Sequence, residues 1–248
     1  MRSAVTGALV ARAAQALLLG RPPGGAARWT RTNHRGRPLS LLSGPALAMA
    51  LASTADLPRR AALVAALGAA AVGAYDDASG DRHPHAKGFR GHAAALGSGQ
   101  VTAGAVKVIG IGGTGLVAAR LVGGRDVLLG GAVVAASANL LNLLDLRPGR
   151  ALKVGALTAL ALRQPGPAAA AAALLPDDLH ERTMLGDCGA NALGAVLGLA
   201  LLHRHPQRSA QALAGLTALT ALSEVVSYSR VIDAVPPLRW VDRLGRLP

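Results

Sequence analysis

Residues 73–88 read GAYDDASGDRHPHAKG, and this polar stretch follows an almost charge-free run, Ala61–Ala74. Asp76 and Asp77 therefore stand where an apolar helix is expected to meet water. Neighbouring carboxylates raise each other's pKa unless a cation or a positive side chain compensates their charge. The stretch is thus a candidate site for a metal ion or a phosphate-bearing ligand. The simpler interpretation is a solvated acidic loop at the end of a helix.

Composition indicates that this stretch belongs to a membrane protein. Of the 248 residues, 51% are hydrophobic and only 16% are charged, which is too apolar for a typical soluble domain. The net charge is +13, but aromatic residues make up only 2% and the arginines lie between apolar runs. This pattern favours contact with membrane lipids and argues against nucleic-acid binding. The single cysteine, Cys188, excludes an internal disulfide framework.

The apolar runs predict one integral membrane domain, residues 1–248, with an all-α fold of about nine spans and active-site loops in the cytoplasm. The first run lacks a clean small-x-small cleavage site, so we favour a retained span over a signal peptide. Five arginines within Arg21–Arg37 mark that loop as cytoplasmic, with the N-terminus outside and the C-terminus inside. The expected spans are Ser3–Gly20, Pro38–Thr54, Ala61–Tyr75, Val101–Arg120, Val127–Leu144, Ala151–Leu162, Gly166–Leu175, Cys188–Leu202 and Ser209–Tyr228.

The number of crossings depends on Gln164–Pro167, which separates two short apolar runs. Proline and glycine there make either a tight turn between two helices or a break in a single crossing. Two crossings place every acidic residue except Asp56 and Asp126 on the cytoplasmic side. Because acidic residues contribute little to topology, such segregation points to a function for them.

Further polar positions lie at the ends of the later runs. Asn139 and Asn142 are three residues apart and share a helical face that continues to Asp145. Such residues can simply form interhelical hydrogen bonds worth about 0.6–2 kcal/mol. Here, however, the face leads directly into a basic turn, Arg147–Lys153. Asp187 stands among small residues at an expected helix start, where a ligand can approach the backbone.

Four motifs in chain order carry a family resemblance. They are the Asn33-His34-Arg35-Gly36 loop, Asp76-Asp77 followed by Lys87-Gly88-Phe89, the run NLLNLLD at 139–145 and the run MLGDCG at 184–189. Together they resemble the cytoplasmic signatures of polyprenyl-phosphate N-acetylhexosamine-1-phosphate transferases. This glycosyltransferase 4 superfamily includes phospho-N-acetylmuramoyl-pentapeptide transferase. The resemblance extends over most of the chain.

The resemblance implies an enzyme of cell-envelope glycan synthesis, such as peptidoglycan synthesis, at the cytoplasmic face of the cell membrane. Polyprenyl phosphate attacks a UDP-amino-sugar, UMP leaves, and Mg²⁺ or Mn²⁺ is the cofactor. Asp187 and Asp77 are the implied metal ligands, while Asp76 and Asp77 are the implied catalytic residues, with Asp76 positioning the lipid phosphate. Basic residues suit the charge of a diphosphate. The implied substrate-binding residues are Asn33, Arg35, Lys87, Asn142, Asp145, Arg147, Arg150 and Lys153.

The chain also departs from the family pattern. Leu146 and Pro148 stand where the family has a glycine and a second aspartate, and Pro236–Arg246 replaces a late histidine cluster. The alternative hypothesis is a catalytically reduced paralogue that acts as a membrane partner or regulator of envelope synthesis. A transporter is disfavoured because its charges should lie near the midplane. The sugar, the lipid length and a homodimeric state stay open.

Overall fold

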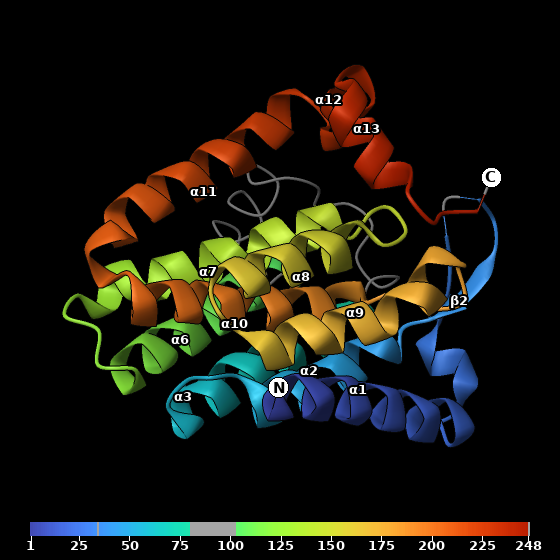
Figure 1. Cartoon of the computed structure of the whole chain (residues 1–248), viewed down its shortest axis with the longest axis horizontal. Coiled ribbons are helices and arrows are strands. Elements are labelled where there is room, and N and C mark those ends of the chain that lie inside the picture. Colours follow the sequence, from blue (N-terminus) through green and yellow to red (C-terminus); the bar gives the residue numbers. More distant parts are fainter. Residues whose placement is uncertain (34, 80–102, 248) are drawn as a thin grey trace.

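A computed structural model describes residues 1–33, 35–79 and 103–247 of the chain, which form a helical bundle with one small two-stranded sheet (Figure 1). The expectation of a mainly helical fold is thus confirmed. The longer helices are α1 (Arg2–Gly20), α2 (Ser43–Thr54), α4 (Ala69–Ser79), α6 (Ala103–Leu121), α7 (Val127–Leu144), α8 (Arg150–Ala161), α9 (Pro165–Leu179), α10 (Gly186–Arg204) and α11 (Ser209–Val225). The shorter elements include α3 (Arg59–Leu63), a π-turn η2 (Val64–Gly68), α12 (Tyr228–Ala234) and α13 (Pro236–Arg243).

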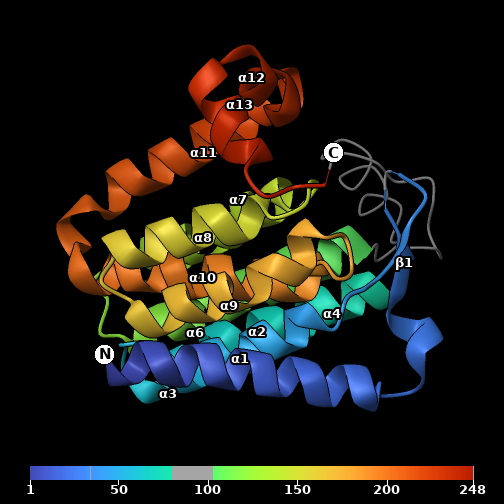
Figure 2. The ribbon, with the colours of Figure 1, turned by 45° about the vertical axis from the view of Figure 1, so that its right-hand side comes forward.

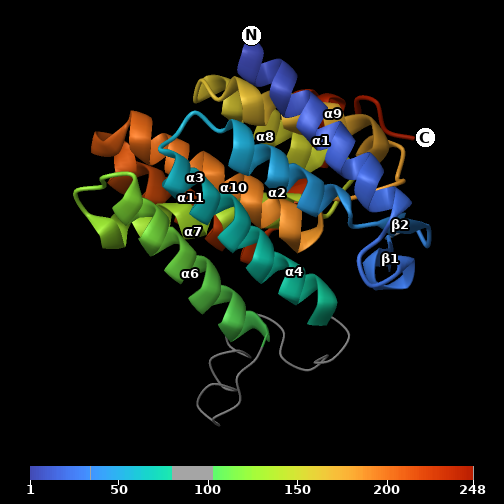
Figure 3. The ribbon, with the colours of Figure 1, turned by 90° about the horizontal axis from the view of Figure 1, so that it is seen from below.

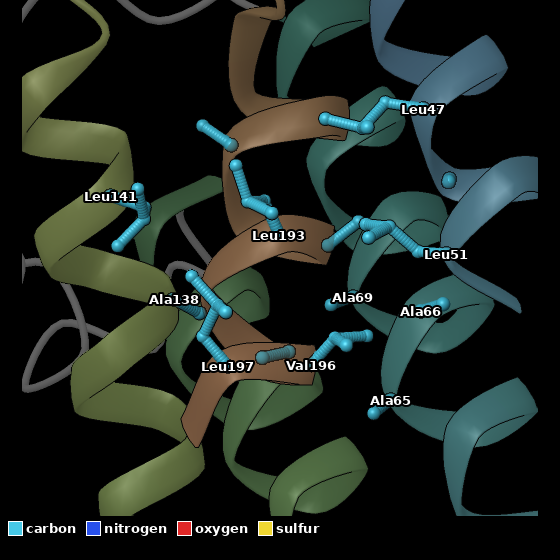
Figure 4. Packing of buried hydrophobic residues seen from close by; sticks show 14 of the residues in the cluster. Leu47, Leu51, Ala65, Ala66, Ala69, Ala138, Leu141, Leu193, Val196 and Leu197 are labelled. Atoms are coloured by element: carbon cyan, nitrogen blue, oxygen red, sulfur yellow. The ribbon is translucent and has the colours of Figure 1, made fainter. Parts of the chain in front are cut away.

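Helix α10 forms the centre of the bundle. In Figure 4 its side chains Leu193, Val196 and Leu197 lie between α7 on one side and α2 with the α3–α4 segment on the other. Glycines allow the close approach to α7, because a Cβ at Gly194 would collide with the α7 backbone and a Cβ at Gly198 would collide with the Ser137 side chain of α7. The abundance of alanine and glycine in the apolar runs therefore sets the packing distance between these helices.

Three helical segments in the described part of the chain are long and apolar enough to cross a membrane: Arg2–Gly20, Arg59–Ala78 and Val127–Leu144. A fourth is possible if Pro206–Val225 and Tyr228–Ala234, bent by 91° against each other, count as one span. The expected nine spans are therefore not confirmed. One reason is length, because α2 and α8 have 12 residues each and α9 has 15, against the roughly 20 that a span needs.

Helices α8 and α9 form a hairpin with a tight turn at Gln164–Pro167. This is the first of the two arrangements considered for these residues, a turn between two helices. The start of α8 lies beside the end of α9, where the N–H of Gly149 donates to Asp178 Oδ1 at 2.5 Å. At the other end of the hairpin, the buried Gln164 exchanges hydrogen bonds with the backbone of Asp56, at 2.7 and 3.1 Å. The hairpin therefore brings Asp178 to the same end of the bundle as the C-terminal end of α7.

The polar residues of the first apolar run bind neighbouring helices. Arg12 Nη1 contacts Asp177 Oδ2 of α9 at 2.5 Å, and Gln15 Nε2 donates to Ser43 Oγ of α2 at 2.8 Å. Gln15 is 2% exposed, so this hydrogen bond satisfies a buried amide. These contacts explain why an otherwise apolar helix carries an arginine and a glutamine.

One segment near the N-terminus differs from the expected pattern. Pro38–Ser40 was expected to open a span but forms strand β2, which pairs antiparallel with β1 (Thr30–Thr32), and helix α2 begins only at Ser43. After α11 the chain continues as the short helices α12 and α13. In Figures 1 and 2 helix α11 runs away from the centre of the bundle, and α12 and α13 lie at its far end.

Candidate functional site

Asp77 joins the end of α4 to the start of α10. Its two carboxylate oxygens accept hydrogen bonds from the N–H groups of Asp187 and Cys188, each at 3.0 Å. The first N–H groups of a helix lack partners within the helix, and the helix dipole favours a negative charge there. Gly73 permits this approach, because a Cβ at that position would collide with the carbonyl group of Asp187. Two motifs that lie 110 residues apart therefore meet directly.

Lys107 of α6 binds the two acidic side chains next to Asp77, those of Asp76 and Asp187. Its ammonium group donates to Asp76 Oδ2 at 3.1 Å and to Asp187 Oδ2. With its amide turned to match these neighbours, Asn142 donates to Asp187 Oδ1 at 2.8 Å and accepts from Lys107 Nζ at 2.9 Å. The sequence signal for Lys107 was a lone lysine in a glycine-rich apolar run, but no role was predicted for it.

The side chains of Asp76, Asp77, Asn142 and Asp187 line a cavity of about 310 Å³ at one end of the bundle, here called the acidic cavity. Figure 3 shows α4 and α6 side by side where they approach this end. Arg31, which the sequence did not single out, donates to the backbone carbonyl of Asp77. The lining residues are Arg31, Leu41, Asp76, Asp77, Asn142, Asp145, Leu146, Met184, Gly186 and Asp187.

A second cavity, of about 250 Å³, shares Asp145, Leu146 and Met184 with the acidic cavity and is here called the adjoining cavity. Its wall is built by the β1–β2 hairpin, the turn after α7 and the segment that links α9 to α10. Its other lining residues are Thr32, Asn33, Leu39, Arg147, Pro148, Asp178, Glu181 and Thr183.

Glu181 organises the loop that contains the first motif. Asn33 Nδ2 donates to Glu181 Oε2 at 2.9 Å, and Arg35 Nη1 donates to Glu181 Oε1 at 3.1 Å. Asn33 Oδ1 also accepts from the N–H groups of Arg35 and Arg37, each at 2.9 Å, which closes the turn. Burial raises the pKa of Glu181, but its hydrogen bonds with Arg35 and Asn33 outweigh this effect and leave the pKa below its usual value. Asn33 is thus held in the wall of the adjoining cavity, and Arg35 is held against Glu181 of the same wall.

Asp145 and Asp178 form a buried acidic pair, 7% and 2% exposed. Among the described residues, neither Oδ2 atom has a hydrogen-bond partner. Burial, followed by the charges of Asp178 and Asp187, raises the pKa of Asp145 well above its usual value. Burial also raises the pKa of Asp178, to about 7, against the opposing effect of the Gly149 N–H. Asp145 was predicted as a substrate-binding residue, whereas Asp178 was not named as a site residue.

The basic residues after α7 differ in what they contact: one lines a cavity, and two bind the C-terminal helix. Arg147 is half-buried and lines the adjoining cavity. Arg150 is 5% exposed and binds Asp242 of α13 through Nε and Nη2, at 2.8 and 3.2 Å. Lys153 donates to backbone carbonyl groups at the end of α13, including that of Asp242 at 2.9 Å. Both residues were predicted to bind substrate, and in the structure both contact the C-terminal helix.

The donor set of the acidic cavity suits a magnesium ion. Among the described residues, no three His, Cys, Asp or Glu side chains form a ready-made metal site. Magnesium prefers oxygen ligands, however, and usually takes only one or two carboxylates before phosphate oxygens and water complete its shell. Asp187 accepts from Lys107 and Asn142, and each Asp77 oxygen keeps a lone pair beyond its backbone hydrogen bond. The predicted substrate-binding residue Lys87 lies outside the described residues.

The fold and the site together define a helical bundle with helices of membrane-spanning length and a polar cavity at one end. The chain was compared with protein-family models, with curated proteins and with solved structures, and none of these comparisons gave a match.

Proposed function

We propose that the protein is a phosphoglycosyltransferase that moves a sugar-1-phosphate, of the N-acetylhexosamine type, from a UDP-sugar to polyprenyl phosphate. The reaction belongs at the cytoplasmic face of the cell membrane, in the synthesis of a cell-envelope glycan. The observation that carries the proposal is the convergence of separate polar motifs, from Arg31 to Asp187, on the acidic cavity. The cavity lies at the end of apolar helices, where the phosphate of a membrane lipid can reach it.

In this proposal an oxygen of the lipid phosphate attacks the sugar-linked phosphorus of the UDP-sugar, and the bond from that phosphorus to UMP breaks. Asp187 and Asp77 would hold Mg²⁺ or Mn²⁺, which would supply positive charge to the diphosphate. Asp76 positions the lipid phosphate. Lys107, which binds Asp76 and Asp187, keeps the two carboxylates in place and adds a positive charge beside the reacting phosphates.

The adjoining cavity suits the nucleotide-sugar end of the donor substrate. Arg147 is available for a phosphate, since arginine binds phosphate with paired hydrogen bonds. Asp145 lines both cavities and can accept from hydroxyl or amide groups of the substrate. Asn142 orients Asp187, while Asn33 and Arg35 shape the wall through Glu181.

A transfer assay tests the proposal. Purified full-length protein is incubated with polyprenyl phosphate, a panel of UDP-amino-sugars and Mg²⁺ or Mn²⁺, and both UMP and the lipid-linked sugar are measured. We expect equal amounts of the two products, and loss of both in a chelator. Absence of product with every donor, from a folded protein that still binds UDP-sugar, would reject the transferase.

One observation favours the second hypothesis, a catalytically reduced membrane partner. Leu146 is 70% exposed at the position where the family has a glycine, and Pro148 replaces an aspartate. A reduced paralogue retains saturable UDP-sugar binding without turnover. Equilibrium binding measured beside the transfer assay separates the two functions.

A further inference from the structure

Helix α13, Pro236–Arg243, has two unlike faces. Trp240 and Leu244 are four residues apart and lie on one side, whereas Asp242 lies on the opposite side. Asp242 is 8% exposed and faces the bundle, while Trp240 is 67% exposed and Leu244 55%. Such an arrangement is typical of an amphipathic helix that packs one side on the protein and exposes its apolar side to a partner surface.

The inner face is fixed to the bundle beside the candidate site. Asp242 binds Arg150 and, at 2.7 Å, Arg246, while Arg246 Nε donates to the carbonyl of Pro148 at 2.8 Å. Burial raises the pKa of Asp242, but the hydrogen bond and charge of Arg150 together with Arg246 and Lys153 leave it below its usual value. Lys153 also satisfies the carbonyl groups at the C-terminal end of the helix. The orientation of α13 is therefore set, with Trp240 directed away from the bundle.

The outer face combines apolar and positively charged groups. A shallow hollow of about 490 Å³ is lined by Pro236, Arg239, Trp240, Arg243, Leu244 and Gly245. Arg243 is 68% exposed at its side chain and makes one long contact with Asp233, at 3.6 Å. Two further apolar residues of the same helix, Leu238 and Val241, are partly exposed, at 47% and 41%.

We infer that α13 docks on the surface of the bilayer, with the phosphate of an anionic phospholipid in the hollow between Arg239 and Arg243. Guanidinium groups bind phosphate well, and tryptophan prefers the boundary between head groups and acyl chains. The chain carries a net charge of +13, which attracts an anionic leaflet. Helix α11, which leads to this region, is mostly exposed along its length and apolar, as expected for a helix that faces lipid. This inference does not depend on transferase activity.

Trp240 itself reports the docking. The chain has two tryptophans, so the Trp29→Phe variant leaves Trp240 as the only one. The full-length variant is placed in nanodiscs of phosphatidylcholine or of phosphatidylcholine mixed with phosphatidylglycerol, each with or without lipids brominated near the head group. We expect quenching of Trp240 by brominated lipid, at least twofold stronger when phosphatidylglycerol is present. Equal emission with and without bromine would overturn the inference.

A charge-reversed variant tests the role of the hollow. In the same background, Arg239→Glu with Arg243→Glu should remove the effect of phosphatidylglycerol, whereas Arg208→Glu, an exposed arginine outside α13, should leave it unchanged. The milder pair Arg239→Gln and Arg243→Gln guards against unfolding of α13 and should also lose the effect. If Trp240 emission changes with protein concentration in detergent and not with lipid, the face binds a second copy of the chain, and the lipid inference is wrong.

Discussion

A single lysine offsets much of the charge in the acidic cavity. Asp76 and Asp187 lie beside apolar helices, and the Lys107 ammonium group donates to both. The Lys107→Met substitution should therefore destabilise the protein, by somewhat less than the about 3–5 kcal/mol seen when one partner of a fully buried pair is removed. Thermal unfolding in detergent measures this loss. Lys107→Arg is the matched control and should retain most of the stability. Equal stability of all three proteins would contradict the pairing.

Two arginines three residues apart should have different roles. Arg147→Ala is expected to weaken UDP-sugar binding by about 1.5–3 kcal/mol, the range for charged hydrogen bonds, without affecting stability. Arg150→Ala should instead release α13, because Asp242 loses its buried partner. Calorimetric titration and hydrogen exchange over residues 228–247 distinguish these effects. If Arg147→Ala exposes α13 and Arg150→Ala leaves it protected, the assignment is wrong.

The buried Asp178 predicts a pH dependence of stability. Its pKa is about 7 in the folded protein, against 3.8 for the free side chain. Between these values the folded state binds more protons than the unfolded state, so the free energy of unfolding falls as the pH rises from about 4 to about 7. Asp145 shifts in the same direction, so Asp178→Asn should reduce this slope without abolishing it. Chemical unfolding at several pH values measures the slope, and an unchanged slope in the variant would contradict the prediction.

At the scale of elements, the hairpin of α8 and α9 determines which residues share one end of the bundle. In a Cys188→Ala background, Leu146→Cys and Arg182→Cys should react with an impermeant thiol reagent from the same side of oriented vesicles. Arg163→Cys, in the turn of the hairpin, should react from the opposite side. If positions 146 and 182 were labelled from opposite sides, Asp145 and Asp187 would lie at opposite ends of the bundle, and the shared site would be wrong.

Periodicity and spacing could predict the helices but not all of their contacts. The runs ending near Asp77 and Asp145 and starting near Asp187 are helices whose ends meet, as the segregation of acidic side chains indicated. Arg150 and Lys153 were assigned to substrate because a basic turn attracts phosphate, whereas their partners lie about 90 residues later in α13. Likewise, the pairing of Asp178 with Asp145 depends on a tertiary approach that neither local sequence shows.

At the scale of the whole molecule, small residues allow short helices to pack around α10. The described helices include three candidates for membrane spans, and up to four with the bent pair, so the nine crossings that the apolar runs predicted are not confirmed. The acidic side chains nevertheless divide between the ends of the bundle: Asp56 binds Arg204 at the end of α10, whereas Asp187 lies at its start. The candidate site therefore depends on which acidic residues share one end of the bundle and not on the number of spans.

The most direct test of the central claim is the rate of UMP release in the presence of polyprenyl phosphate, UDP-amino-sugar and Mg²⁺, compared among the wild type, Asp187→Asn and Asp56→Asn. Asp56 is an exposed acidic residue at the far end of the bundle and serves as the matched control. We predict that Asp187→Asn lowers the rate at least 100-fold, about 2.7 kcal/mol in the activation barrier, while Asp56→Asn retains the wild-type rate and both variants stay folded. Equal turnover by Asp187→Asn and the wild type, or wild-type turnover in chelator, would contradict a metal-dependent site in the acidic cavity.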